Sequence, residues 1–357
     1  MPLHRRALRG GEPNEDRQER SGDSSRVSNE NDAESNSQGD GALQEAELWE
    51  KIESTHGVER AEVLAELSHF AYSRDDYTTC LQLVETSLDL YRTSDPNATT
   101  SPSTLHQLVH LHEGKAFSHR KLQQYREAAA AFQEIARLQR ERDNFEGHVQ
   151  AIRAAGCDWY AATEWEKSLA CHREAQSAID PDANDGSRGV DALNIGMSLS
   201  KLERYEEAVA SFLQARDYFK ATKDPSDVHH VDYQIALAYI ALGNGPEAKF
   251  YAKHEFNYAK VAENFTAEGV ARMHLGKAHA LCGEYEEAEA QLVRALEMLT
   301  VEERKDWEDI IDANRALIDV LFALNREDEA KERLEQLTTI EETWSTDLKA
   351  ELRGEPR

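Results

Sequence analysis

The chain has 357 residues, 40% of them hydrophobic, and its 41 Lys and Arg against 68 Asp and Glu give a formal net charge of −27. Such an acidic surface repels phosphate backbones, so we expect no nucleic-acid partner. No stretch approaches the roughly 18 consecutive apolar residues of a membrane helix, and no apolar run follows the N-terminal arginines, so we expect neither membrane insertion nor export.

Three zones of different composition follow one another along the chain. Residues 1–41 are polar and almost free of aromatic and branched apolar side chains, which predicts a disordered tail. Residues 42–343 show apolar side chains at helical spacing and no strand-like alternation, which predicts an all-α repeat domain. Residues 344–357 are predicted to be a C-terminal capping helix and tail.

A repeating pattern runs through the predicted helical domain. A small residue is followed nine positions later by an aromatic residue, three positions further by a second small residue, and four positions after that by an apolar one. The aromatic position falls at Tyr77, Tyr125, Trp165, Tyr205, Gly245, Tyr285 and Glu327, where Gly245 and Glu327 replace the aromatic residue. From Tyr125 to Tyr285 the position recurs every 40 residues. We therefore expect about seven helix hairpins, with a second helix opening at each of these residues.

The small residues mark the closest approach of two helices in each hairpin. Gly196 and Gly276 fall on first helices, and Ala208 and Ala288 fall on second helices, at sites that leave no room for larger side chains. A tight turn is expected between the two helices, with glycine at 243 and 283 supplying backbone freedom. One such hairpin buries only one face, so neighbouring hairpins must stack to complete a core.

These small and aromatic positions resemble the tetratricopeptide repeat family, over about residues 57–340. The period of 40 exceeds that family's usual 34, and the proline after the second helix is mostly missing. Serine at 68 and isoleucine at 318 replace the small residue in the first and last repeats. The resemblance implies a right-handed α-solenoid of about seven hairpins and a function in protein–protein interaction.

Motifs of enzymes and cofactor sites are missing from the sequence. The two Gly-Lys dipeptides lack the other residues of a phosphate-binding loop, and no nucleophile stands in a known catalytic motif. His106, His110 and His112 form the one local histidine cluster, which lacks the four ligands of a structural zinc site. Four scattered cysteines without a CxxC pair are typical of a reduced cytoplasm. We predict a cytoplasmic protein, not an enzyme, without metal or cofactor; the preference for Arg over Lys suggests a bacterial source.

In the tetratricopeptide repeat family, the first helices of the hairpins line a concave channel. Amide and basic side chains fall there about once per repeat, and amides can pair with a peptide backbone of any sequence. Neighbouring Tyr and Met side chains can supply apolar pockets. The predicted peptide-binding residues are Arg153, Tyr160, Asn194, Met197, Tyr233, Gln234, His274, Lys277 and Arg315.

Three hypotheses for function remain open from the sequence. The first is a non-enzymatic adaptor or scaffold that binds a peptide segment of a partner protein in the channel. The second is a peptide-responsive regulator without a DNA-binding domain of its own. The third is self-assembly through the ends of the array. The sequence makes no prediction of the partner's identity, the oligomeric state, or whether the bound segment is extended or helical.

Overall fold

The computed structural model describes residues 43–94, 101–179, 186–222, 225–301 and 307–352. The predicted tail at 1–41 lies outside this part. The chain divides into two compact units, which we call the N-terminal unit (Pro2–Ala178) and the C-terminal unit (Ile179–Arg357). All regular structure in the described ranges is helical, which confirms the predicted all-α class.

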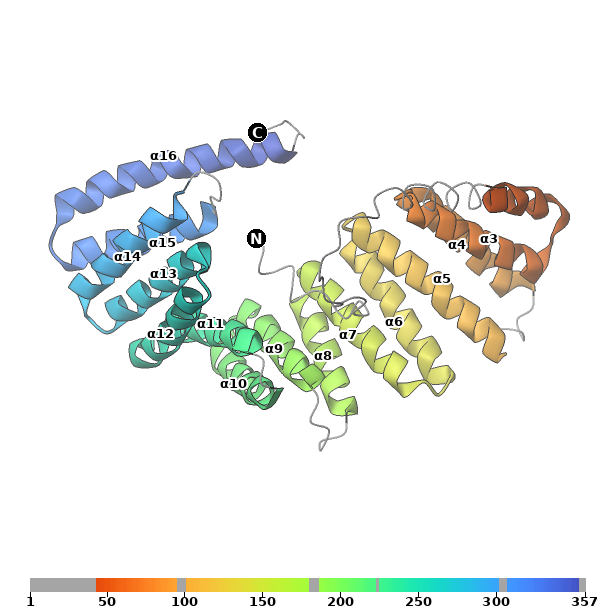
Figure 1. Cartoon of the computed structure of the whole chain (residues 1–357), viewed down its shortest axis with the longest axis horizontal. Helices are drawn as coiled ribbons and strands as arrows, with labels where there is room; N and C mark the ends of the chain where they lie inside the picture. Colours follow the sequence, from red (N-terminus) through yellow and green to blue (C-terminus); the bar gives the residue numbers. More distant parts are fainter. Residues whose placement is uncertain (1–42, 95–100, 180–185, 223–224, 302–306, 353–357) are drawn as a thin grey trace, which may run out of the picture. The chain divides into compact units, whose positions relative to one another are not determined.

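The N-terminal unit consists of three helix hairpins preceded by a helix at residues 43–54 (Figure 1). Its hairpins are formed by α3 (Gly57–Ser73) with α4 (Tyr77–Ser94), α5 (Pro102–Lys121) with α6 (Tyr125–Glu141), and α7 (Phe145–Ala161) with α8 (Trp165–Ala178). The second helix of each hairpin packs on the first helix of the next, α4 on α5 and α6 on α7.

The C-terminal unit consists of four further hairpins. They are α9 (Gly186–Lys201) with α10 (Tyr205–Thr222), α11 (Pro225–Ala241) with α12 (Gly245–Val261), α13 (Phe265–Leu281) with α14 (Tyr285–Leu299), and α15 (Trp307–Ala323) with α16 (Glu327–Leu352). The first helices α9, α11, α13 and α15 contact one another in that order, and we call them the first-helix row. The predicted solenoid of seven tetratricopeptide-like hairpins is thus confirmed. The boundary predicted at residue 344 falls inside α16.

The predicted starts of the second helices agree with the structure at all seven hairpins. Each second helix begins at the residue that occupies the aromatic position, from Tyr77 for α4 to Glu327 for α16. This agreement arises because the same turn separates the two helices of every hairpin. Three residues form each of these turns, and the middle residue has a positive φ, as at Gln123, Thr163 and Glu203.

Hydrogen bonds explain why the turn is so uniform. The amide of the third turn residue donates to a carbonyl five residues earlier, as from Gln124 to His119 at 2.8 Å and from Glu284 to His279 at 3.0 Å. This is the Schellman arrangement, which requires a left-handed residue directly after the helix. Glycine meets that requirement without strain at 243 and 283, where φ is 70° and 75°.

The close-packed glycines are confirmed, and the space at them is smaller than predicted. A Cβ built on Gly196 would lie 2.4 Å from the ring of Phe212, and one on Gly276 would lie 2.7 Å from Leu292. Not even a methyl group fits at these two positions. In the hairpin of α11 and α12, the fully buried pair Ala236 and Ala252 packs in one core cluster.

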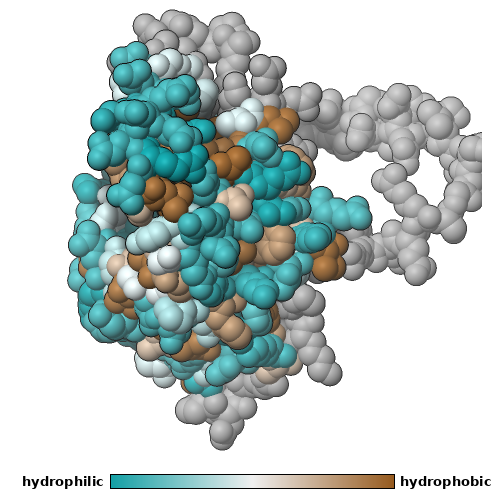
Figure 2. Space-filling model, turned by 90° about the vertical axis from the view of Figure 1, so that its left-hand side faces the viewer, coloured by the Kyte–Doolittle hydropathy of each residue, from teal (hydrophilic) through white to brown (hydrophobic). Residues whose placement is uncertain are grey.

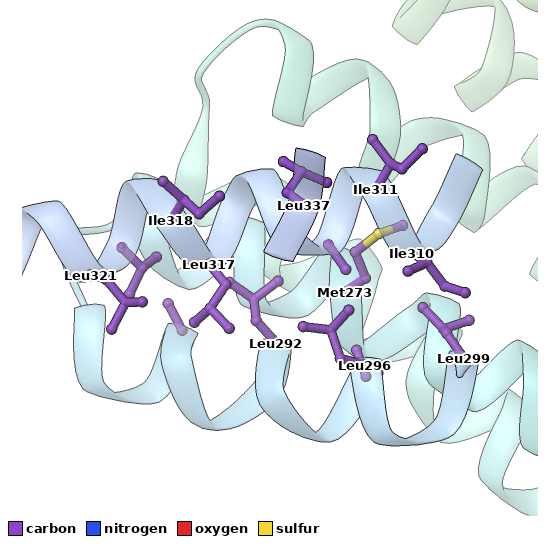
Figure 3. Close-up of a cluster of buried hydrophobic side chains, with 14 of the residues drawn as sticks. Met273, Leu292, Leu296, Leu299, Ile310, Ile311, Leu317, Ile318, Leu321 and Leu337 are labelled. Carbon is purple, nitrogen blue, oxygen red and sulfur yellow. The ribbon is translucent and has the colours of Figure 1, made fainter. Parts of the chain in front are cut away.

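A hydrophobic core of the C-terminal unit joins its last two hairpins. Figure 3 shows Met273 of α13, Leu292 of α14, Leu317 of α15 and Leu337 of α16 directed toward one another. These side chains are 4% exposed or less. Burial of apolar surface between hairpins therefore stabilises the stack, as expected when a single hairpin covers only one of its faces.

Candidate functional site

The nine predicted peptide-binding residues fall on the first helices of five hairpins. Arg153 and Tyr160 lie on α7 in the N-terminal unit. The others lie along the first-helix row of the C-terminal unit, at Asn194, Met197, Tyr233, Gln234, His274, Lys277 and Arg315. Seven of the nine predicted residues therefore lie in the C-terminal unit, and the two on α7 lie in the N-terminal unit.

Burial divides the residues of the first-helix row into three groups. Asn194, Met197, Gln234 and His274 are buried, at 8%, 5%, 8% and 2% exposure. Tyr233 and Lys277 are half-buried, whereas the side chain of Arg315 is 65% exposed. The difference between His274 and Arg315 follows from their register: His274 lies two residues before the close-packed position of its helix and Arg315 lies three before.

Tyr233 and His274 form a direct contact between neighbouring first helices. Their ring centroids lie 5.2 Å apart at an interplanar angle of 58°, and the ring centroid of His230 lies 6.2 Å from that of Tyr233. Tyr233 is the less buried of the two contacting residues. The structure thus brings together two predicted site residues from consecutive repeats.

His274 has an internal partner that the sequence did not predict. Its Nδ1 lies 3.0 Å from Oε2 of Glu255 on α12, and both side chains are almost fully buried. Glu255 occupies the repeat position held by buried alanines in other hairpins, such as Ala215 and Ala295, exactly one period away on each side. That departure from the repeat was the available signal, because a buried acid in place of alanine needs a partner.

The two basic residues further along the row are also paired within the chain. Lys277 forms an ion pair with Asp312 of α15, and Arg315 lies 2.7 Å from Glu341 of α16. Both pairs are at least partly exposed, so solvent weakens them and a ligand can compete for either cation. The spacing in the sequence predicted the positions of Lys277 and Arg315 on first helices but not their acidic partners.

Among the predicted site residues of the row, Asn194 has a buried donor without a partner in the described ranges. Its backbone carbonyl accepts a hydrogen bond from the Ser198 hydroxyl at 2.9 Å. Its Nδ2 atom is buried and has no hydrogen-bond partner among the described residues. An unpaired buried donor costs about 1–3 kcal/mol, so this amide gains free energy from any acceptor that reaches it.

Arg153 and Tyr160 are half-buried on α7 of the N-terminal unit. Burial raises the pKa of Tyr160 to about 12, so its hydroxyl stays protonated at neutral pH. Next to them, Arg120 of α5 donates to Asp158 of α7 at 2.7 Å and to the Ala154 carbonyl at 3.1 Å. These two hydrogen bonds tie α5 to α7.

The described ranges contain neither a cluster of metal ligands nor a helix that could span a membrane. In those ranges no three His, Cys, Asp or Glu side chains converge as ligands for a metal ion. Among the same residues, no helix combines the length and apolar character needed to span a bilayer. On the face shown in Figure 2, apolar and polar residues are interspersed.

Comparison with known proteins supports the repeat assignment. The tetratricopeptide repeat profile matches residues 192–216, which lie within the hairpin of α9 and α10. No curated protein sequence matches the chain.

Two solved structures resemble the fold at low sequence identity. The apo form of RapI is 10% identical with a TM-score of 0.54, over 78% of this chain and 76% of that one. A signal transduction ATPase with a tetratricopeptide repeat sensor, from Pyrococcus horikoshii, is 13% identical with a TM-score of 0.52. The match covers 80% of this chain and 40% of that ATPase. At such identities the likeness establishes the fold alone.

Proposed function

We propose that the chain is a non-enzymatic adaptor that binds a peptide segment of a partner protein along the first-helix row of the C-terminal unit. The row offers an amide donor at Asn194, an amide at Gln234 and an aromatic ring at Tyr233, from consecutive repeats. Lys277 and Arg315 add cations that can exchange their internal partners for acidic groups of a ligand. Successive helices about 8–10 Å apart would each serve about three residues of an extended peptide.

The buried, unpartnered Nδ2 of Asn194 is the observation that carries this proposal. A peptide carbonyl is the natural acceptor, because every residue of an extended ligand presents one. The donor is enclosed in the free chain, so a ligand reaches it only after neighbouring side chains move. This enclosure also favours the second candidate function, a regulator whose conformation responds to a bound peptide.

Selection from a phage-displayed library of random peptides tests the proposal. We expect the full chain to enrich a shared motif, and a variant with Asn194→Ala and Tyr233→Ala to lose binding of the selected peptides while its helical circular dichroism stays unchanged. A matched control replaces Phe250 and Gln336 by alanine, an exposed aromatic and an exposed amide on second helices of the same unit. The control should bind as the wild type does.

Two results would overturn the proposal: no enriched motif, or equal affinity of the double variant and the wild type for the selected peptides. X-ray scattering then separates the two candidate functions. An unchanged radius of gyration on peptide binding supports the adaptor, and compaction supports the regulator.

A further inference from the structure

A pair of histidines on α5 holds two imidazole nitrogens at ligand spacing. Nε2 of His106 lies 3.0 Å from Nε2 of His110, one helical turn away, with the two rings nearly perpendicular at 83°. Both residues are exposed. The outer nitrogen of each ring is also occupied: Nδ1 of His110 lies 3.0 Å from Glu113, and Nδ1 of His106 lies 3.1 Å from a guanidinium nitrogen of Arg142.

These contacts favour one tautomer for each ring of the pair. Arginine can only donate, so Nδ1 of His106 is an acceptor and its proton is on Nε2. An ionised Glu113 can only accept, so His110 carries its proton on Nδ1. The Nε2 proton of His106 therefore points at the free lone pair of His110. One nitrogen of the pair is ready to bind a cation, and the other becomes ready when its proton moves to Nδ1.

We infer that His106 and His110 form a binding site for a divalent cation of the Cu²⁺ type, with water in the remaining positions. With metal–nitrogen bonds of about 2 Å, two ligands at a right angle lie about 2.8–2.9 Å apart, and tetrahedral ligands about 3.3 Å apart. The observed 3.0 Å lies between these two values, so a small shift of the rings reaches either geometry, including the tetragonal one that Cu²⁺ prefers. Cu²⁺ also has the highest affinity for nitrogen ligands in the first-row series.

The two outer partners act on this site in opposite directions. Glu113 holds the His110 proton on Nδ1, which is the support that metal-bound histidines commonly receive from a carboxylate. Arg142 opposes metal binding. A metal ion on Nε2 of His106 requires the proton of that ring to lie on Nδ1, and a protonated Nδ1 can no longer accept the hydrogen bond from Arg142. Arg142 also donates to Gln139 at 3.2 Å, so it can keep one partner when it leaves His106.

Within the part of the chain that the structure describes, no third protein ligand joins the two histidines. Water completes the coordination, so the cation exchanges with solvent and is not a structural ion. The site therefore differs from a structural zinc centre of the zinc-finger type, which the sequence also argues against.

Titration of the full chain with Cu²⁺ in the presence of glycine as a competing ligand, followed by calorimetry and electron paramagnetic resonance, tests the inference. We expect one site with nitrogen hyperfine structure, absent from His106→Gln and from His110→Gln. His69→Gln is the matched control, since it removes an exposed first-helix imidazole elsewhere in the N-terminal unit.

Two more variants test the roles of the outer partners. Glu113→Gln should weaken copper binding about 10-fold or more, and Arg142→Gln should strengthen it. The inference is overturned if His106→Gln and His110→Gln keep the wild-type copper signal, or if Arg142→Gln weakens binding as much as Glu113→Gln does. Unchanged circular dichroism of the variants excludes misfolding as the cause of a lost signal.

Discussion

At the scale of single residues, Glu255 and His274 replace the ordinary residues of the repeat as a pair. At the repeat position of Glu255 other hairpins carry a buried alanine, and at the repeat position of His274 the preceding first helix carries Gln234. A buried hydrogen bond contributes only modest net stability, yet removing one partner leaves the other unsatisfied. The pair is therefore tolerated in the repeat because both changes occur together.

Restoring the repeat residues tests this coupling. Glu255→Ala alone should lower the free energy of unfolding by about 2 kcal/mol or more, because His274 loses its buried acceptor. The double variant with His274→Gln should recover most of that loss. Urea denaturation of the two single variants and the double variant gives the coupling energy, and additive effects would contradict a direct interaction.

A second residue-scale prediction concerns Asp158 and pH. Burial raises the pKa of its carboxyl to about 6, and the hydrogen bond from Arg120 only partly opposes this shift. The unfolded chain binds the proton less tightly, so this group's contribution to stability is complete below about pH 4 and is lost as pH rises to about 6. Asp158→Asn should therefore gain about 3 kcal/mol relative to wild type across this window, as measured by urea denaturation at each pH.

His112 provides the control with the opposite sign. Burial lowers its pKa to about 4, so the neutral folded form loses stability as pH falls from about 6.5 to 4. His112→Gln should gain stability relative to wild type as the solution is acidified, and Asp158→Asn should lose it. Parallel pH profiles for the two variants would show that other groups govern the titration.

At the scale of elements, the turn inside each hairpin is more uniform than its sequence. The middle residue has a positive φ in all seven hairpin turns of the described ranges, although only Gly243 and Gly283 are glycines. Thr163 adopts a φ of 60° in the same position. A branched side chain is strained in this conformation, so tertiary packing holds this residue against its own preference.

Opposite substitutions at two of these turns test that statement. Thr163→Gly should raise the free energy of unfolding by up to about 1 kcal/mol, because relief of strain exceeds the entropy that glycine adds to the unfolded chain. Gly283→Ala should lower it by about 1 kcal/mol for the same backbone reason, since a Cβ at 283 meets no atom within 4 Å. Thermal denaturation measures both, and equal signs would refute the argument.

At the scale of the whole molecule, stability should be local. The chain divides into two compact units, and within each unit the hairpins pack on their sequence neighbours, as expected of a repeat array. A change in one hairpin should therefore weaken that hairpin and its neighbours and leave distant ones unaffected.

Gly276→Leu tests this locality. The new side chain would overlap Leu292 of α14 and should destabilise the C-terminal unit by about 1–3 kcal/mol. Hydrogen exchange with mass spectrometry should show faster exchange in α13 and α14, with protection in α3 to α6 unchanged. Equal loss of protection in both units would contradict nearest-neighbour stability.

The sequence by itself determined the helix class, the number of hairpins and the first residue of each second helix. These features depend on contacts that recur with the period of the repeat, so one pattern of small and aromatic residues specifies them all. It also placed Gly196 and Gly276 at the closest helix approach, although it allowed a methyl group where the structure leaves no room.

Only the tertiary structure decided which first-helix residues face a neighbouring hairpin and which face solvent. A shift of one position along a helix turns a side chain by about 100°, which separates buried His274 from exposed Arg315. Partners such as Glu255 for His274 and Arg142 for His106 come from other helices, and their distances depend on how the helices cross. A single sequence carries no direct record of those crossings, so ion pairs, unpaired donors and the division into two units appear only once the chain is folded.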